Sequence, residues 1–331
     1  MKRLAIFAGY DKNNIIDDYV LFYLKELNKF SDIIYVADCE MQETELNKVK
    51  DYTIKSISEK HGEYDFGSYK RGYIYAKENN ILENYDYLIL CNDSVYGPFF
   101  NFKEIVENME NKNTDVWGIF KHLENGDITE HLQSFFISIH NKIFISKEYN
   151  DFIMSIKKEK NKWDVIINYE LKMSLLFQRM NFTISYFLDS SIIKKPINYN
   201  LPLYYTYYLI SNYKFPFLKI MAIREPNIST LNANQLLYII KIIKDTYDIR
   251  LIINHLNRII HENNEIKKLL QKFNEFNKYF IKENLLSCCG HYNLYFKYQL
   301  IFKIANFIKI TVNIPDKFAY YKDFNFLLTK K

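Results

Sequence analysis

The sequence predicts an α/β fold in which helices cover both faces of a mainly parallel sheet, with a helical extension at the C-terminal end. Short apolar runs alternate with stretches whose apolar residues recur on one helical face, the pattern of β–α units. Seven of the eight glycines lie at or before Gly126, where the turns of such units are expected. A hydrophobic fraction of 48% and a charged fraction of 25% over 331 residues suit a well-buried core and exclude general disorder.

The first half of the chain carries the alternation of strands and helices. Apolar runs predict strands at 4–8, 33–37, 52–57, 87–91, 116–119 and 133–140. One-sided apolar patterns predict helices at 15–29, 66–78, 102–109 and 168–179. Because the links between these segments are short, we expect successive strands to run parallel beneath crossover helices.

The second half is less regular and more basic. Residues 204–213 are rich in aromatic side chains, and helices are expected at 236–245, 251–260 and 264–281. From Leu251 onward the chain holds 13 Lys and Arg against 6 Asp and Glu, whereas the first 250 residues hold 31 against 33. We therefore divide the chain into an α/β domain at 1–220 and a helical, basic extension at 221–331.

Composition excludes several classes of protein. A net charge of +5 is too mild for a dedicated nucleic-acid binder, so no nucleic-acid partner is expected. The chain has no run of eighteen uncharged apolar residues, and its first residues reach Asp11 too soon for a signal peptide. The four cysteines lack zinc spacing, so we expect reduced thiols in a cytoplasmic protein. The motifs of P-loop NTPases, dinucleotide dehydrogenases, zinc proteases and α/β-hydrolases are absent.

Polar residues follow three of the predicted strands. They are Gly9 and Asp11 after the first, Asp38 after the second, and Asn92-Asp93-Ser94 after the fourth. Because ligands bind beyond the carboxyl ends of parallel strands, these residues are candidates for one pocket. Asp93 is the candidate metal ligand, for Mg²⁺ or Mn²⁺, with diphosphate oxygens completing the shell. The alternative is that Asp93 belongs to a Gly-Pro turn and caps the next helix.

A glycine-rich segment at 61–72 is the second motif. Asp65 is expected to cap a helix whose first turn holds Gly67 and Ser68, and a helix N-terminus is a natural anion site. Lys70 would add positive charge. The segment therefore predicts a pyrophosphate or sugar contact. A capped helix with a closely packed glycine explains the same pattern equally well.

The third motif joins two distant segments. His131, Gln133 and Ser134 precede an apolar strand, and Glu170 lies in a predicted helix. Gln133 and Ser134 suit hydrogen bonding to a hydroxyl-rich acceptor, and a carboxylate beside a cleft can serve as a general base. Glu170 is thus the candidate base, with His131 in reserve. The alternatives are a surface helix carboxylate and a structural histidine.

Four blocks of the sequence resemble those of a known family. HGEYDFGSYKRGY, YLILCNDSVYGPF, DVWGIFKH with HLQSFF, and VIINYELKMS match the rhamnan synthesis protein F family in order and spacing, from about Leu4 to Pro216. Its members are regarded as glycosyltransferases of bacterial surface polysaccharides such as O-antigen, capsule or rhamnan. The resemblance implies a Rossmann-like GT-A-type domain, in which Asn92-Asp93-Ser94 takes the place of an Asp-x-Asp metal triplet. The single carboxylate leaves metal dependence open.

The resemblance also implies a substrate pair. The donor would be a dTDP- or UDP-linked sugar, with dTDP-L-rhamnose first, and transfer would invert the anomeric centre. The acceptor would be a glycan or a polyprenyl-linked glycan. A basic C-terminal segment suggests peripheral contact with the inner face of the membrane, although Lys297, Lys303 and Lys309 would share a face only in a strand. A transferase of galactose, a heptose or an amino sugar, and a non-catalytic scaffold, are the alternatives.

Overall fold

The computed structural model describes residues 1–126, 128–194, 200–224, 231, 233–259, 299–304 and 308–313. They belong to two compact units, Met1–Phe273 and Asn274–Lys331. The predicted boundary near residue 220 stays a prediction, and the first unit continues past it. The helix predicted at 264–281 lies outside the described residues, as does Lys297.

An eight-stranded sheet forms the centre of the first unit, and its order is β3-β2-β1-β4-β8-β6-β7, with β9 also paired to β6. Its strands are β1 (Arg3–Gly9), β2 (Asp32–Ala37), β3 (Lys55–Ser58), β4 (Tyr87–Asn92), β6 (Val116–His122), β7 (His131–Leu132), β8 (Phe136–His140) and β9 (Ile184–Asp189). The pairs among β3, β2, β1 and β4 are all parallel, whereas β8 runs antiparallel to β4 and β6. The predicted mainly parallel sheet is confirmed, and the antiparallel β7 and β8 make it mixed.

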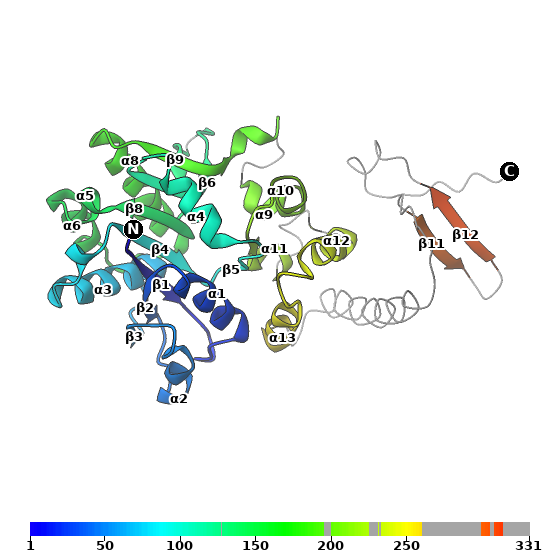
Figure 1. The fold of residues 1–331 in the computed structure, drawn as a ribbon, viewed down its shortest axis with the longest axis horizontal. Helices are drawn as coiled ribbons and strands as arrows, with labels where there is room; N and C mark the ends of the chain where they lie inside the picture. The colour runs from blue at the N-terminus through cyan, green and yellow to red at the C-terminus, as the bar shows by residue number, and fades with distance from the viewer. Residues whose placement is uncertain are drawn as a thin grey trace. The chain divides into compact units, whose positions relative to one another are not determined.

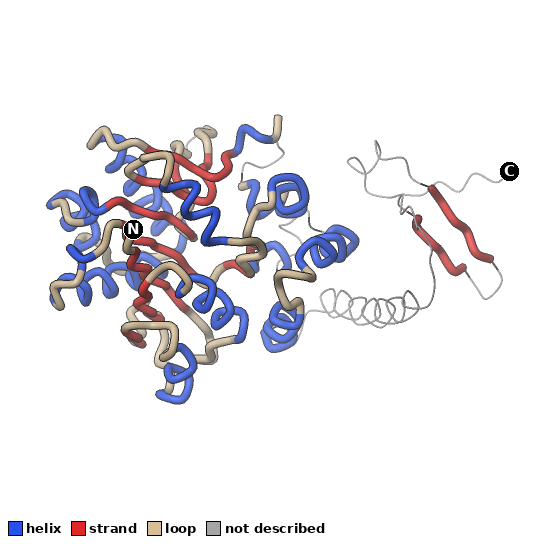
Figure 2. The backbone as a smooth tube through the Cα atoms, viewed as in Figure 1, coloured by secondary structure: helices blue, strands red, loops and turns tan. Residues whose placement is uncertain are grey.

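Helices cover both faces of this sheet, as Figure 2 shows. The longer ones are α1 (Asp18–Asn28), α3 (Tyr64–Glu78), α4 (Phe102–Glu110), α6 (Lys147–Met154) and α8 (Lys172–Arg179). Successive residues of a strand point to opposite faces. Accordingly Ala5 and Phe7 of β1 pack in one buried cluster with α1 and α4, and Leu4 and Ile6 pack in another with α3, α6 and α8 (Figure 1). The sheet is therefore buried on both faces.

Further elements complete the first unit. The helices are α2 (Glu43–Leu46), α5 (Asn141–Phe144), α7 (Lys162–Val165), α9 (Leu201–Tyr204), α10 (Thr206–Tyr213), α11 (Ile220–Arg224), α12 (Ala233–Ile243) and α13 (Arg250–Ile259). Strand β5 (Val95–Tyr96) pairs with β10 (Leu218–Lys219) in a separate small sheet. Helices α10 to α13 pack against the same buried cluster as α1 and α4, and α12 and α13 confirm the helices predicted at 236–245 and 251–260. Among the described helices, none is long and apolar enough to cross a membrane.

The described part of the second unit is two paired strands. They are β11 (Gln299–Ile304) and β12 (Ile308–Asn313), which run antiparallel. The segment at 295–309, which the sequence left open between helix and strand, is thus extended where it is described.

Two predicted elements differ from the structure near the functional residues. The strand predicted at 133–140 begins only at Phe136, because the N–H of Ser134 donates to the Glu170 carboxylate in a turn. The helix predicted from Phe66 begins at Tyr64 and its N-cap residue is Glu63, so the prediction that Asp65 caps it is wrong. Asp65 instead lies inside the first turn and accepts a hydrogen bond from Asn92.

Candidate active site

The carboxyl ends of β1, β2 and β4 meet at one edge of the sheet, as predicted. The N–H of Asp38 donates to the carbonyl of Gly9 at 2.9 Å, and the N–H of Tyr10 donates to the carboxylate of Asp93 at 2.7 Å. Gly9 is required here by packing, since a Cβ at this position would stand 2.4 Å from the hydroxyl of Tyr35. The candidate donor residues at these three strand ends therefore share one polar edge.

The Asn92-Asp93-Ser94 segment is tied to helix α3. The side-chain oxygen of Asn92 accepts from the N–H and hydroxyl of Ser94, at 3.1 and 2.6 Å. Its amide nitrogen donates to Asp65 at 2.8 Å. Asn92 is 2% exposed, and these bonds satisfy both ends of its buried side-chain amide. Asn92 thus positions Asp65 and Ser94 around Asp93.

Asp93 and Asp65 form a region of uncompensated negative charge. Burial raises the pKa of Asp93 to about 8, the Tyr10 N–H opposes this rise, and the carboxyls of Asp65 and Asp11 add to it. Burial also raises the pKa of Asp65, although Lys162 and Lys219 act in the other direction. Both shifts say that the charged carboxylates lack sufficient positive charge.

A divalent cation would supply such charge, but the available ligands do not complete a site for it. Within the ranges that the structure describes, no three His, Cys, Asp or Glu side chains are grouped as metal ligands. The amide oxygen of Asn92 is occupied by Ser94, and one oxygen of Asp93 accepts from Tyr10. Mg²⁺ and Mn²⁺ prefer six oxygen ligands. The protein residues alone therefore do not fit the predicted metal.

Glu170 is the centre of a second polar group. It lies in a π-helical segment, Ile166–Leu171, which leads directly into α8. One carboxylate oxygen accepts from the N–H of Ser134 at 2.8 Å and from its hydroxyl. The other lies 3.4 Å from Nε2 of His131. Three of the predicted residues, from two distant segments of the chain, therefore meet in one hydrogen-bonded group.

The pKa of Glu170 is shifted in the opposite direction from that of Asp93. Burial would raise the pKa of Glu170, but His131 and Ser134 outweigh it and lower the pKa to about 2. Burial would lower the pKa of His131, but Glu170 outweighs it and raises that pKa. Nδ1 of His131 also lies 2.8 Å from the carbonyl of Thr129, so both ring nitrogens face acceptors. His131 is thus held as a protonated donor, and Glu170 as an ionised acceptor.

Gln133, the other predicted acceptor-binding residue, stands beside this group with an unsatisfied atom. Its amide nitrogen donates to Asn200 at 3.3 Å. Its side-chain oxygen is buried and has no hydrogen-bond partner among the described residues, and Gln133 is only 6% exposed. A buried acceptor without a donor costs free energy, about 1–3 kcal/mol. A hydroxyl group of a ligand would satisfy it.

The glycine-rich segment is used mainly for structure. Asp38 accepts from the N–H groups of His61 and Gly62, at 2.8 and 2.7 Å. His61 in turn bonds the hydroxyl of Ser68 at 3.1 Å, and a Cβ at Gly67 would stand 2.7 Å from the His61 ring. The structure thus supplies the closely packed glycine that the sequence offered as an alternative.

Lys70 and Asp11 also have protein partners. The ammonium group of Lys70 donates to the carbonyl of Ile156 at 2.7 Å. Asp11 forms an ion pair with Arg258 of α13, which also binds Asp17. Arg258 therefore links α13 to the loop after β1. No motif marked this arginine, because its partners lie 247 and 241 residues away.

Lys219 is the functional residue that sequence reasoning missed. It lies on β10 and pairs with Val95 of β5, the residue that follows the Asn92-Asp93-Ser94 segment. Its ammonium group lies 4.0 Å from the centre of the Phe135 ring, and it interacts electrostatically with Glu170 and Asp65. A two-residue strand has no periodicity, so nothing in the sequence marked this lysine.

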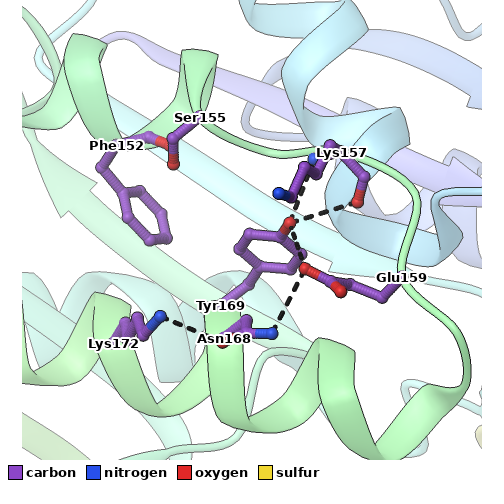
Figure 3. Close-up of a pocket in the computed structure, with 7 residues that line it drawn as sticks. All are labelled: Phe152, Ser155, Lys157, Glu159, Asn168, Tyr169 and Lys172. Carbon is purple, nitrogen blue, oxygen red and sulfur yellow. Dashed lines mark hydrogen bonds between the residues drawn. The ribbon is translucent and has the colours of Figure 1, made fainter.

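A surface pocket is lined in part by Asn168 and Tyr169, which belong to the same π-helical segment as Glu170. It encloses about 350 Å³ and is lined by Phe152, Ser155, Lys157, Glu159, Asn168, Tyr169 and Lys172. Figure 3 shows that its polar side chains bond one another. The Tyr169 hydroxyl donates to Glu159 at 2.8 Å, and Asn168 donates to the same carboxylate at 3.2 Å. Glu170 does not line this pocket, which we therefore separate from the candidate active site.

The fold and this edge define a class: an α/β protein with a candidate ligand site at the carboxyl ends of its parallel strands. The chain belongs to the rhamnan synthesis protein F family, whose model it matches over residues 33–321. The family resemblance seen in the four sequence blocks is thereby confirmed.

Two curated relatives match part of the chain. Protein y4gN of Sinorhizobium fredii is 26% identical over 55% of the chain and 47% of its own length. The virulence protein VirA of Vibrio anguillarum is 26% identical over 58% of the chain and 62% of its own length. The chain therefore spans about half to three-fifths of the length of these relatives.

Solved structures show weaker similarity. The mannosyltransferase Ktr4p from S. cerevisiae is 9% identical, with a TM-score of 0.37, over 56% of this chain and 68% of that chain. Core-mannan synthase A from Aspergillus fumigatus, in its Mn/GDP form, is 10% identical, with a TM-score of 0.34, over 56% and 72%.

Proposed function

We propose that this protein is a glycosyltransferase with a GT-A-type domain, which moves a sugar from a nucleotide-sugar donor onto a growing bacterial surface polysaccharide. Membership of a family described by rhamnan synthesis makes L-rhamnose from dTDP-L-rhamnose the first choice of donor sugar. The observation that carries the proposal is the proximity of two polar groups, around Asp93 and around Glu170: Asp65, which Asn92 binds, interacts electrostatically with both carboxyls.

The proposed mechanism is a direct displacement with inversion at the anomeric carbon, through an oxocarbenium-like transition state. Glu170 takes the proton of the acceptor hydroxyl. A carboxylate with a pKa of about 2 is a weak base, so proton transfer comes late, after attack on the sugar has made the hydroxyl acidic. His131 does not compete for this role, because both of its ring nitrogens face acceptors. The unsatisfied oxygen of Gln133 would accept from an acceptor hydroxyl.

The donor would lie at the strand ends, with the nucleoside near Gly9, Asp11 and Asp38 and the diphosphate near Asp93. The acceptor would be a glycan carried on a polyprenyl lipid. The basic segment after residue 251 would then bring the enzyme to the inner face of the cell membrane, from the cytoplasm. O-antigen, capsule and rhamnan are the products in keeping with this family.

The test is consumption of nucleotide sugars by the purified full chain, over a panel of dTDP-, UDP- and GDP-linked donors with an acceptor lipid. We expect selective turnover of one donor and a loss of about 10²–10⁴-fold in Glu170→Gln, with donor binding retained. Glu159→Gln is the matched control, since Glu159 lies in the separate pocket, and its turnover should equal that of the wild type.

Each result assigns the function differently. Turnover of another sugar would keep the class and replace rhamnose. Equal turnover in Glu170→Gln and the wild type would remove Glu170 from the base role. No consumption and no binding of any donor would overturn the proposal in favour of a non-catalytic glycan-binding or scaffold protein.

A further inference from the structure

Lys219 is a partly buried cation without a counter-ion at contact distance. Among the residues that the structure describes, no carboxylate lies within 4.0 Å of its ammonium group, and no hydrogen bond to it is formed. Its contact is the face of Phe135, with the ammonium group 4.0 Å from the ring centre. A cation–π contact compensates only part of the loss of hydration. The position therefore favours an anionic ligand.

The backbone holds this ammonium group beside the strand-end segment. Lys219 is in register with Val95, and the N–H of Ile220 donates to the carbonyl of Ser94 at 3.0 Å. The backbone at Lys219 is thus paired with the two residues that come directly after Asp93 in the chain. A rigid backbone attachment of this kind gives a flexible lysine a defined place in the site.

A second lysine adds charge to the same place. Lys162, at the start of α7, is exposed and interacts electrostatically with both Lys219 and Asp65. The charges of His131 and Glu170 compensate each other as a pair. Two lysines then face one further carboxylate, Asp65, whereas the protein ligands for a divalent cation are incomplete.

We propose that Lys219, with Lys162 beside it, forms an anion subsite that binds the diphosphate of the nucleotide-sugar donor, so that lysine ammonium groups rather than a divalent cation neutralise the leaving group. This rests on the proposed function and names the part of the donor that the subsite recognises. In the transfer step, the bond between the anomeric carbon and the phosphate oxygen breaks, and its electron pair leaves on that oxygen. Lys219 donates a hydrogen bond to the same oxygen. The acceptor oxygen forms the new bond, and its proton goes to Glu170.

The experiment is calorimetric titration of the full chain, in EDTA, with inorganic pyrophosphate and separately with UDP, dTDP and GDP. A hydrogen bond to a charged group corresponds to about 10- to 100-fold in affinity, so Lys219→Met should weaken pyrophosphate binding by that factor. Lys219→Arg, which keeps the charge, should restore most of it. Lys55→Met is the matched control, because Lys55 also lies on a strand over an aromatic ring, 5.4 Å from the centre of Tyr75, and its affinity should be unchanged.

Proton uptake supplies a readout that a structural role would not move. Burial lowers the pKa of Lys219 to about 8, so the free site is about half protonated at pH 8. A bound anion stabilises the ammonium form, and binding at pH 8 should therefore take up protons. Titrations in buffers of different ionisation enthalpy measure this uptake, which should be smaller in Lys219→Met, where Asp93, with a pKa also raised to about 8, supplies what remains.

The outcomes separate this inference from the function. Unchanged pyrophosphate affinity in Lys219→Met, or wild-type binding only after Mg²⁺ is added, overturns the subsite. If sugar transfer is equally fast in the wild type and Lys219→Met, the subsite is wrong and the function stands. If pyrophosphate binds through Lys219 but no nucleotide sugar is consumed, the subsite stands and the function is wrong.

Discussion

The two polar regions of the candidate site treat a carboxyl group in opposite ways. At the strand ends, Asp93 accepts one hydrogen bond from Tyr10, and its pKa is raised to about 8. Around the π-helical segment, Glu170 has His131 and Ser134 as donors, and its pKa is lowered to about 2. Pairs of carboxyls whose environments separate their pKa values commonly have different roles. The carboxyl of Asp93 lacks positive charge until a ligand binds, whereas the carboxylate of Glu170 already has its partners within the protein.

Among the changes that test this comparison, removal of Glu170 is expected to change the free energy of unfolding most. Glu170→Ala removes the partner that keeps His131 protonated and leaves both donors of Ser134 without their acceptor, so we expect a loss of about 3–5 kcal/mol in the free energy of unfolding at pH 7. Urea unfolding measures this loss. Glu159→Ala, in the surface pocket, should lose much less, and an equal loss in the two variants would contradict a special role of the His131 pair.

The same carboxylate predicts acid sensitivity. A folded-state pKa of about 2 lies below the ordinary value of 4.5, so the stability it contributes is present above about pH 4.5 and is lost as pH falls toward 2. Glu170→Ala should therefore show a flatter fall in stability over this interval than the wild type does.

Asp93→Asn is expected to have a smaller effect of the opposite sign. The folded-state pKa of Asp93 is raised from 3.8 to about 8, so its contribution is fully present below about pH 3.8 and is lost as pH rises toward 8. Asparagine does not ionise, so the Asp93→Asn variant does not lose this stability as the pH rises. We expect the variant to be about 1–3 kcal/mol more stable than the wild type at pH 8, and equal to it near pH 4.

Thermal unfolding at several pH values measures the difference between Asp93→Asn and the wild type. A variant that is less stable than the wild type at pH 8 would show that the Asp93 carboxylate already has adequate compensation inside the protein.

Ser134→Ala gives the smallest expected effect. It removes the hydroxyl donor to Glu170 but leaves the N–H donor in place. We expect a loss of about 0.5–1.5 kcal/mol in the free energy of unfolding and a rise in the pKa of Glu170. Titration of the carboxyl by infrared or NMR spectroscopy checks the second effect. An unchanged pKa would mean that His131 alone holds Glu170 ionised.

The first region could be predicted from sequence because the topology places it. Four parallel strands follow the alternation of apolar and polar segments, so the residues after β1, β2 and β4 had to meet at one edge. The contacts made there could not be predicted. Lys70 turns to the carbonyl of Ile156, and Gly67 makes room for His61, because both depend on neighbours that are distant in sequence.

The second region was visible only as residue types. Glu170, His131 and Ser134 were candidates, but their meeting depends on a π-helical segment and on a turn that interrupts a strand. Neither feature has a recognisable periodicity, and π-helical segments are frequent at functional sites. Lys219 lies on a two-residue strand and carried no signal at all. Regular elements thus place the strand-end region, and irregular ones build the rest of the site.

The measurement that tests the central claim most directly is calorimetric titration of a nucleotide-sugar panel into the wild type, Asp93→Asn and Glu170→Gln, with and without Mg²⁺ or Mn²⁺. The account predicts selective binding of one donor without added metal. This binding should be tighter in Asp93→Asn, because a poorly compensated carboxyl beside the diphosphate opposes its charge, and retained in Glu170→Gln, because only the strand-end region receives the donor. Binding that Asp93→Asn leaves intact and Glu170→Gln abolishes would contradict the division between the two regions, and no binding of any donor would contradict the transferase.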